Sequence, residues 1–249
     1  MNDREESGRR AAGELTERLD AVRVRIERAA RRAGRDPGAV TLVAASKTVP
    51  VERLVEAVAC GCRVFGENRV QEALAKIAAM NAYAGLEFHL IGPLQPNKVT
   101  HAVGRFALLH AVDRLDVAER LDRAARERGI TQRVLLEVNV AGETTKHGFR
   151  PDDLKSAAER MGAFAGLRVL GLMTIPPPAE KPEDTRPHFR RLRVLAEEVE
   201  AIRIPGVSMK ELSMGMSGDF EVAIEEGATL VRIGTALFGP RPVGLGENV

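Results

Sequence analysis

The sequence predicts an α/β fold, a single (β/α)8 barrel of the TIM type with an additional N-terminal helix and no second β domain. Three observations carry this prediction. Eight short runs rich in Val, Leu and Ile alternate with stretches of helical periodicity. These runs lack polar alternation, which is typical of parallel strands buried on both faces. The length of 249 residues fits one such barrel.

The predicted elements follow one another along the whole chain. The first is an amphipathic helix over residues 11–34, whose apolar residues recur at spacings of three and four. The strands are expected at 40–45, 62–65, 87–91, 106–110, 133–140, 168–174, 210–213 and 229–233. The helices between them are expected at 51–60, 68–82, 96–103, 114–128, 151–164, 185–202 and 217–226. A doubly wound open sheet is the alternative, but no Gly-rich dinucleotide-binding motif follows the first strand.

This regular alternation predicts one domain. We expect a flexible N-terminus over residues 1–10, the barrel over 11–241 and a C-terminal tail over 242–249. The proline-rich segment 176–187 would be a long surface loop inside the barrel domain, because strands and helices are predicted on both sides of it.

Composition narrows the classes of function. The chain has 37 Lys and Arg against 35 Asp and Glu, a net charge of +2, which disfavours a dedicated nucleic-acid binder. Aromatic residues make up 4%, too few for a platform that stacks nucleic-acid bases. No apolar run predicts a membrane span, and the N-terminus lacks the apolar stretch of a secretory signal. Cys60 and Cys62, in the sequence Cys-Gly-Cys, favour neither a disulfide nor a metal site, so we expect a reduced, cytoplasmic protein.

Polar residues gather where the predicted strands end, and barrels of this class form their active sites at those ends. Lys47 follows the first strand. Partial desolvation at the barrel mouth would favour its free amine, the form that attacks carbonyl groups. A lysine that simply reaches solvent is the alternative, and position alone does not decide between them.

The segments after the seventh and eighth strands predict an anion site. Residues 213–219 contain two glycines and precede a helix, for which Ser217 is a candidate N-cap. Gly234 and Thr235 form the second loop, and barrels of this class often bind phosphate between these two loops. Ordinary capping and turn chemistry would also explain these residues.

Arg232 lies inside the last apolar strand, where a charge is costly unless it is paired or faces a polar ligand. A structural salt bridge would satisfy it. Taken with Lys47 and a phosphate site, Arg232 instead points to pyridoxal 5′-phosphate (PLP), which offers an aldehyde, a phosphate and a ring nitrogen.

Six ordered segments resemble the pyridoxal phosphate homeostasis protein family of the YggS/PROSC type. They are A-S-K-T (45–48), F-G-E-N-R-V-Q-E (65–72), H-L-I-G-P-L-Q-P-N-K (89–98), L-M-T-I-P (172–176), E-L-S-M-G-M-S-G-D (211–219) and V-R-I-G-T-A-L-F-G (231–239). The resemblance extends from about residue 11 to about residue 241. It implies a single barrel of the alanine racemase type that holds PLP as an internal aldimine on Lys47.

The resemblance also implies a set of cofactor-binding residues. They are Lys47, Asn68, His89, Ser213, Ser217, Arg232, Gly234 and Thr235. Within this set Arg232 would face the ring nitrogen, and the serines with Gly234 and Thr235 would contact the phosphate. Other positions match the family pattern without an assigned role, namely Asn139, Lys146 and Gly148. Arg69 stands where many relatives carry Tyr, so no ring-stacking role is assigned to it.

The same resemblance leaves a choice between an enzyme and a carrier. Racemases of this fold use the cofactor lysine and a tyrosine from a second, β-rich domain. Here only P-V-G-L-G-E-N-V follows Arg241, and the single tyrosine, Tyr83, is predicted away from the strand ends. An arginine beside the ring nitrogen also leaves that nitrogen unprotonated, which weakens the ring as an electron sink.

We therefore expect a cytoplasmic PLP-binding protein that acts in intracellular PLP homeostasis, by buffering or delivery, with no assigned catalytic residue. One alternative is a weak amino-acid racemase or another aldimine-based enzyme. A second is a protein-interaction module regulated by PLP, docking through loop 176–187 or the basic stretch 186–193. The expected partners are PLP and apo forms of PLP-dependent enzymes, without nucleic acid, membrane or metal, and the chain would be a monomer or weak dimer.

Overall fold

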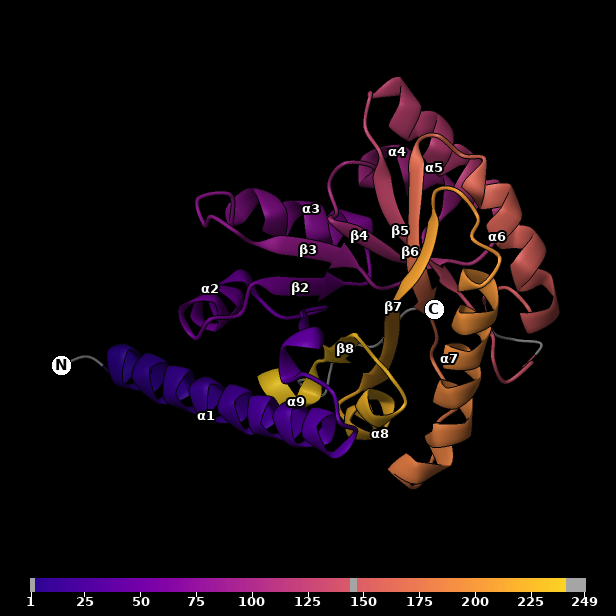
Figure 1. The fold of residues 1–249 in the computed structure, drawn as a ribbon. Coiled ribbons are helices and arrows are strands. Elements are labelled where there is room, and N and C mark those ends of the chain that lie inside the picture. The colour runs from indigo at the N-terminus through magenta and orange to yellow at the C-terminus, as the bar shows by residue number, and fades with distance from the viewer. Residues whose placement is uncertain (1–2, 144–146, 241–249) are drawn as a thin grey trace.

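The apolar runs form eight parallel strands that pair in sequence order and close into a barrel with β1 beside β8 (Figure 1). This computed structural model describes residues 3–143 and 147–240. The strands are β1 (Thr41–Ala45), β2 (Val64–Glu67), β3 (Glu87–Leu90), β4 (Leu108–Val112), β5 (Gln132–Glu137), β6 (Leu167–Met173), β7 (Val207–Met216) and β8 (Leu230–Ile233). The predicted (β/α)8 barrel is confirmed, the open sheet is excluded, and no second β domain occurs among the described residues.

Helices follow the strands and surround the barrel. They are α1 (Asp3–Arg32), α2 (Val51–Ala59), α3 (Val70–Ala79), α4 (Val99–Ala102), α5 (Leu115–Glu127), α6 (Leu154–Gly162), α7 (Arg186–Glu200), α8 (Phe220–Glu225) and α9 (Thr235–Phe238). Short 3-10 helices cover Pro37–Ala39, Pro96–Lys98, Pro151–Asp153 and Pro182–Thr185. Within this part of the chain, no helix is long and apolar enough to cross a membrane.

Helix α1 lies outside the barrel along α8 and α9 (Figure 1). Its apolar stripe, which includes Leu15 and Leu19, is buried, and Arg25 pairs with Glu221 of α8 at 2.7 Å. The helix begins at Asp3 and ends at Arg32. The proposed domain boundaries, including the flexible terminus over residues 1–10, stay predictions, and the tail 242–249 lies outside the described residues.

The largest differences from the predicted elements lie at β7 and α9. Strand β7 covers ten residues rather than 210–213, because its Gly- and Met-rich end still pairs with β8. The pairing passes from Ser213 opposite Leu230 to Met216 opposite Arg232, so one extra residue of β7 forms a bulge. Helix α9 follows β8 directly, where the sequence indicated only a loop.

The wall of the barrel separates two cores. Outward-facing side chains pack against the helices, and inward-facing ones fill the barrel. The inward apolar residues are Val43, Ile91, Leu108, Ala111, Leu135, Met173 and Leu230. Four polar side chains on β3, β4, β7 and β8 are also buried, namely His89, His110, Ser213 and Arg232. The barrel interior therefore contains polar as well as apolar side chains, and the polar ones extend toward the carboxyl ends of the strands.

Candidate functional site

The carboxyl ends of the strands enclose a cavity of about 550 Å³. It is lined by six of the eight predicted cofactor residues, namely Lys47, Asn68, Ser217, Arg232, Gly234 and Thr235. These residues are far apart in sequence, and the parallel barrel brings them to one rim because all its strands end on the same side.

The other two predicted residues, His89 and Ser213, do not line this cavity. Both are buried inside the barrel, with exposed fractions of 4% and 0%. Ser213 bonds to Arg232 and to His110, and His89 bonds to His110. Their side chains thus support the cavity from below, and direct contact of either with a ligand stays a prediction.

Lys47 follows a residue whose backbone and side chain are both held. Ser46 donates its N–H to the Gly66 carbonyl at 2.8 Å and its hydroxyl to Glu67 Oε1 at 2.5 Å. The carbonyl of Ser46 accepts a hydrogen bond from Lys76 Nζ at 2.7 Å. These bonds fix the chain immediately before Lys47, so the half-buried lysine enters the cavity from a rigid base.

The residue after Lys47 is held in an unusual conformation. Thr48 has a φ of 63°, in the left-handed region that β-branched residues rarely adopt, and its hydroxyl donates to the Lys47 carbonyl at 2.6 Å. Such a conformation costs on the order of 1–3 kcal/mol and persists where the surroundings enforce it. The sharp change of chain direction at Lys47 is thus maintained from both sides.

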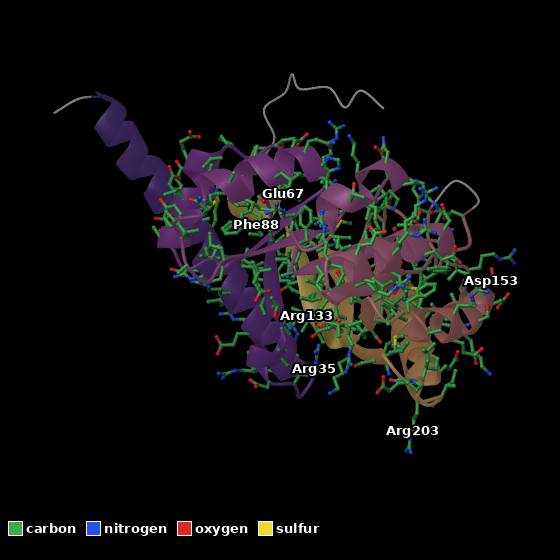
Figure 2. The ribbon with its side chains drawn as sticks, turned by 90° about the horizontal axis from the view of Figure 1, so that it is seen from above. Arg35, Glu67, Phe88, Arg133, Asp153 and Arg203 are labelled. Carbon is green, nitrogen blue, oxygen red and sulfur yellow. The ribbon has the colours of Figure 1, made fainter. Side chains whose placement is uncertain are left out.

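The anchor behind Lys47 is a buried ion pair between β2 and α3. Lys76 Nζ donates to Glu67 Oε1 at 2.7 Å, and the Glu67 side chain has no exposed surface. Its second oxygen, Oε2, has no hydrogen-bond partner among the described residues. Figure 2 labels Glu67 within the densely packed part of the molecule, whereas Arg203 projects from the outer surface. The carboxylate of Glu67 therefore depends on Lys76 for its charge compensation.

Replacing Lys76 by Met should leave the buried carboxylate of Glu67 without its positively charged partner. We expect the free energy of unfolding, measured by urea denaturation, to fall by about 3–5 kcal/mol, since a buried charge is left unpaired. The double variant Glu67→Gln/Lys76→Met should recover most of that loss. The control, Lys155→Met at an exposed position of α6, should change stability by less than about 0.5 kcal/mol. Equal losses in the single and double variants would contradict the dependence of Glu67 on Lys76.

Arg232 supplies a buried positive charge to the cavity. Its Nη1 donates to Ser213 Oγ at 2.6 Å and its Nη2 to the Thr174 carbonyl at 2.9 Å. Burial lowers the pKa of the guanidinium to about 10, and the charges of Glu137 and Asp219 oppose this shift. The group therefore stays protonated at neutral pH, as a hydrogen-bond donor only.

The end of β7 folds closely over α8. Gly215 has a φ of 90°, and a Cβ placed on it would lie 2.6 Å from the Cβ of Ala223 and 2.9 Å from the Cα of Phe220. Any larger residue would clash there, so glycine is required for this loop to reach the cavity.

The loops after β7 and β8 are joined by a hydrogen bond from the Ala236 N–H to Ser217 Oγ, at 3.2 Å. The sequence made Ser217 a candidate for the N-cap of α8, but Asp219 occupies that position. Asp219 Oδ1 accepts from the Met216 N–H at 2.6 Å and closes the turn between them. This turn moves the N-cap of α8 two residues along the chain, from Ser217 to Asp219, and leaves Ser217 on the cavity wall.

An acidic group that the sequence did not identify also lines the cavity. Glu137 ends β5, and burial, aided by the charge of Asp113, raises its pKa to about 7, against the opposing effects of His147 and Arg232. His147 Nδ1 lies 3.3 Å from Asp113 Oδ2. Glu137 is not among the predicted site residues because it lies within an apolar run. Its position two residues after the inward-facing Leu135 could have indicated that it points inward.

The raised pKa of Glu137 makes stability fall as the pH rises from about 4.5 to about 7, because over this interval the folded state retains a proton that the unfolded chain releases. Glu137→Gln should lack this fall. Near pH 8 its free energy of unfolding should exceed that of the wild type by about 2–3 kcal/mol, and the two should converge below about pH 4. Urea titrations across this range measure the difference. Glu119→Gln, at an exposed ion pair with Arg160, is the control, and parallel curves for Glu137→Gln and wild type would refute the expectation.

The residues to which the sequence assigned no role differ in their position relative to the cavity. Asn139 lines the cavity, but its amide closes a loop, since Nδ2 donates to the Glu143 carbonyl at 2.7 Å and Oδ1 accepts from the Glu143 N–H at 3.3 Å. Lys146 lies outside the described residues. Arg69 is exposed at the start of α3, 3.5 Å from Glu72, and does not line the cavity. Tyr83 is 39% exposed in the connection that leads to the amino end of β3, away from the cavity.

Comparisons with known proteins agree with this architecture. The family described as "Alanine racemase, N-terminal domain" matches residues 18–242. A pyridoxal phosphate homeostasis protein of Aquifex aeolicus is 52% identical over 225 residues, which cover 90% of this chain and 97% of that protein. Another, from Pseudomonas aeruginosa, is 46% identical over 231 residues, covering 92% of this chain and 97% of that protein.

Solved structures show the same fold. PipY of Synechococcus elongatus, determined with PLP bound, has a TM-score of 0.79 and 38% identity, covering 90% of this chain and 100% of its own. An alanine racemase of Clostridium difficile has a TM-score of 0.71 with 14% identity, covering 92% of this chain and 57% of its own. At that identity the likeness concerns the fold alone.

Proposed function

Because this chain belongs to the pyridoxal phosphate homeostasis proteins, within the alanine racemase N-terminal domain family, we propose that it binds PLP and acts in PLP homeostasis. One observation carries the proposal. A lysine, an arginine and two glycine-containing loops, widely separated in sequence, line a single cavity at the carboxyl end of the barrel. PLP combines an aldehyde, a ring nitrogen and a phosphate, which are the groups that such side chains recognise.

The cavity has the size and the donors for this cofactor. Its volume of about 550 Å³ lies within the range of small-molecule sites. Lys47 would provide the amine that bonds the aldehyde carbon, and Arg232 would donate to the ring nitrogen. The phosphate would lie against Ser217, Gly234 and Thr235, where two loops are joined by the Ala236–Ser217 hydrogen bond.

When bound, PLP supplies an electrophilic aldehyde carbon. Condensation of the Lys47 amine at that carbon releases one water, and hydrolysis of the bond restores both partners. Attachment through Lys47 would thus be covalent and yet reversible, as buffering or delivery requires. The anchored backbone on either side of Lys47 favours one fixed direction of the amine.

The charge at Arg232 supports holding the cofactor rather than turning over a substrate. Its guanidinium stays protonated at neutral pH, so it would donate to the ring nitrogen and leave that nitrogen without a proton. An unprotonated ring withdraws electrons weakly, which disfavours carbanion chemistry. The tyrosine that could serve as a second base, Tyr83, lies away from the cavity.

The finer parts of the proposal concern partners. We propose that the protein acts in the cytoplasm as a monomer or weak dimer and passes PLP to apo forms of PLP-dependent enzymes. The alternative docking surface on the basic stretch 186–193 has less support, because its arginines are engaged within the chain. Arg186 Nη1 and Arg190 Nη2 both contact Glu226 Oε1, at 3.1 and 2.9 Å.

Replacing Lys47 by Ala tests the covalent attachment. Wild-type protein incubated with PLP should show the visible absorption of lysine-bound PLP, and Lys47→Ala should lose it completely. Lys155→Ala, at an exposed site on α6, is the matched control and should keep the spectrum. A wild type that stays colourless with PLP would overturn the proposed function. Rapid exchange of amino-acid α-protons in deuterated water, on the order of 1 per second or faster, would instead favour the racemase alternative.

The joined loops should carry much of the affinity for the phosphate. Ser217→Ala removes a hydroxyl from the cavity wall and the acceptor of the Ala236 N–H. A hydrogen bond to a charged group contributes about 1.5–3 kcal/mol, so PLP affinity in equilibrium dialysis should weaken roughly 10- to 100-fold. Affinity for pyridoxal, which lacks the phosphate, should change little. Ser156→Ala, whose exposed hydroxyl donates to the Asp153 carbonyl, is the control. Equal effects on both ligands would argue against a phosphate site here.

A further inference from the structure

A continuous row of polar side chains runs through the barrel interior beneath the cavity. It begins at Glu87, which opens β3 at the amino end of the barrel, and ends at Arg232. The bonded pairs are Glu87 Oε2 with His89 Nε2 at 3.4 Å, His89 Nδ1 with His110 Nε2 at 3.0 Å, His110 Nδ1 with Ser213 Oγ at 2.8 Å, and Ser213 Oγ with Arg232 Nη1 at 2.6 Å. We call this row the interior chain.

The two ends of the interior chain decide where its protons lie. Arg232 can only donate, so Ser213 Oγ accepts from it, and an ionised Glu87 can only accept. If the Ser213 hydroxyl donates to His110 Nδ1, then His110 Nε2–H donates to His89 Nδ1 and His89 Nε2–H donates to Glu87. Every proton then has an acceptor, and both imidazoles carry their hydrogen on Nε2.

The opposite direction leaves bonds unmade. If His110 donated from Nδ1 to Ser213, its Nε2 would accept from His89 Nδ1–H. The unprotonated Nε2 of His89 would then face the Glu87 carboxylate, so that two lone pairs would meet. The Ser213 hydroxyl would also have no acceptor within the interior chain. An unmade bond in a buried network is costly, so the direction from Arg232 to Glu87 is favoured.

Neutral histidines fit the surroundings of the chain. Burial lowers the pKa of His110, and the charges of His89 and Arg232 lower it further. Burial also lowers the pKa of His89, against the opposing effect of Glu87. A proton added to His89 Nδ1 would set two N–H groups against each other across the 3.0 Å contact with His110. A proton added to His110 Nδ1 would remove the acceptor of the Ser213 hydroxyl.

We propose that the interior chain is a positioning device for Arg232, which orients its guanidinium toward the cavity through two neutral histidines protonated on Nε2. Ser213 and the Thr174 carbonyl each bind one nitrogen of the guanidinium, so the group cannot rotate about its side chain without losing a buried bond. His110 in turn orients the Ser213 hydroxyl, and His89 orients His110. The benefit for PLP binding rests on the proposed function, whereas the protonation pattern does not.

Nitrogen NMR of histidine-labelled protein without PLP tests the proton pattern directly. At neutral pH, the ¹⁵N shifts and two-bond couplings of His89 and His110 should be those of the neutral Nε2–H form. The remaining three of the five histidines, His101, His147 and His188, are assigned by single Asn variants. An Nδ1–H tautomer or an imidazolium at either buried position would overturn the proposal, whatever the outcome with PLP.

Substitution of His110 tests the positioning role. His110→Leu removes the partner of the Ser213 hydroxyl, and PLP affinity should fall about tenfold or more in equilibrium dialysis. His110→Asn offers an amide oxygen near the former Nδ1 and should retain affinity within about threefold, a rescue that mere filling of space would not predict. A folded Leu variant with wild-type affinity would overturn the positioning role. If wild-type protein does not bind PLP, the proposed function fails while the NMR result still decides the proton pattern.

Discussion

A charged guanidinium inside a closed barrel is the constraint from which much of this structure follows. Transfer of Arg232 out of water is costly unless its charge and its N–H groups are matched. Ser213 and the Thr174 carbonyl satisfy two donors, while Glu137 and Asp219 supply negative charge nearby. The compensation is mutual, since Arg232 lowers the pKa of Glu137 against the larger effect of burial. The polar interior of the barrel is thus organised around one charge at the floor of the cavity.

A second buried charge, outside the barrel wall, supports the rim of the cavity at Lys47. Glu67 and Lys76 pair between β2 and α3, and both bind Ser46, one through its hydroxyl and the other through its carbonyl. This arrangement turns an ion pair into a backbone anchor for the next residue, Lys47. The amine of Lys47 and the guanidinium of Arg232 are therefore held by different sets of hydrogen bonds. Rigid supports suit a protein that holds a ligand in one geometry, because little ordering is left to be done upon binding.

The relation of this chain to the solved alanine racemase concerns the fold alone. The chain shares the barrel fold with an alanine racemase that is 14% identical, and it covers 57% of that chain. Pyridoxal phosphate homeostasis proteins match it over almost their whole length, at up to 52% identity. In the proposed function, Lys47 at the end of the first strand would attach PLP reversibly, and Arg232 on the last strand would face its ring. The single tyrosine of the sequence, Tyr83, does not lie at the cavity, whereas the ionisable side chains of Glu137 and His147 line it.

The sequence by itself determined the fold class, the order of the strands and six residues of the cavity wall. These follow from local patterns, because uninterrupted apolar runs specify buried parallel strands and the rule on strand ends then places Lys47, Arg232 and the glycine loops. Only the tertiary structure decided how deep each side chain lies below the cavity and which way it points. His89 and Ser213 lie one level below the cavity, and Glu137 points into it, because the register between neighbouring strands sets the height of each inward-facing residue. The pairing of Glu67 with Lys76 and the chain from Glu87 to Arg232 depend on contacts between different elements, and the periodicity of a single segment carries no information about them.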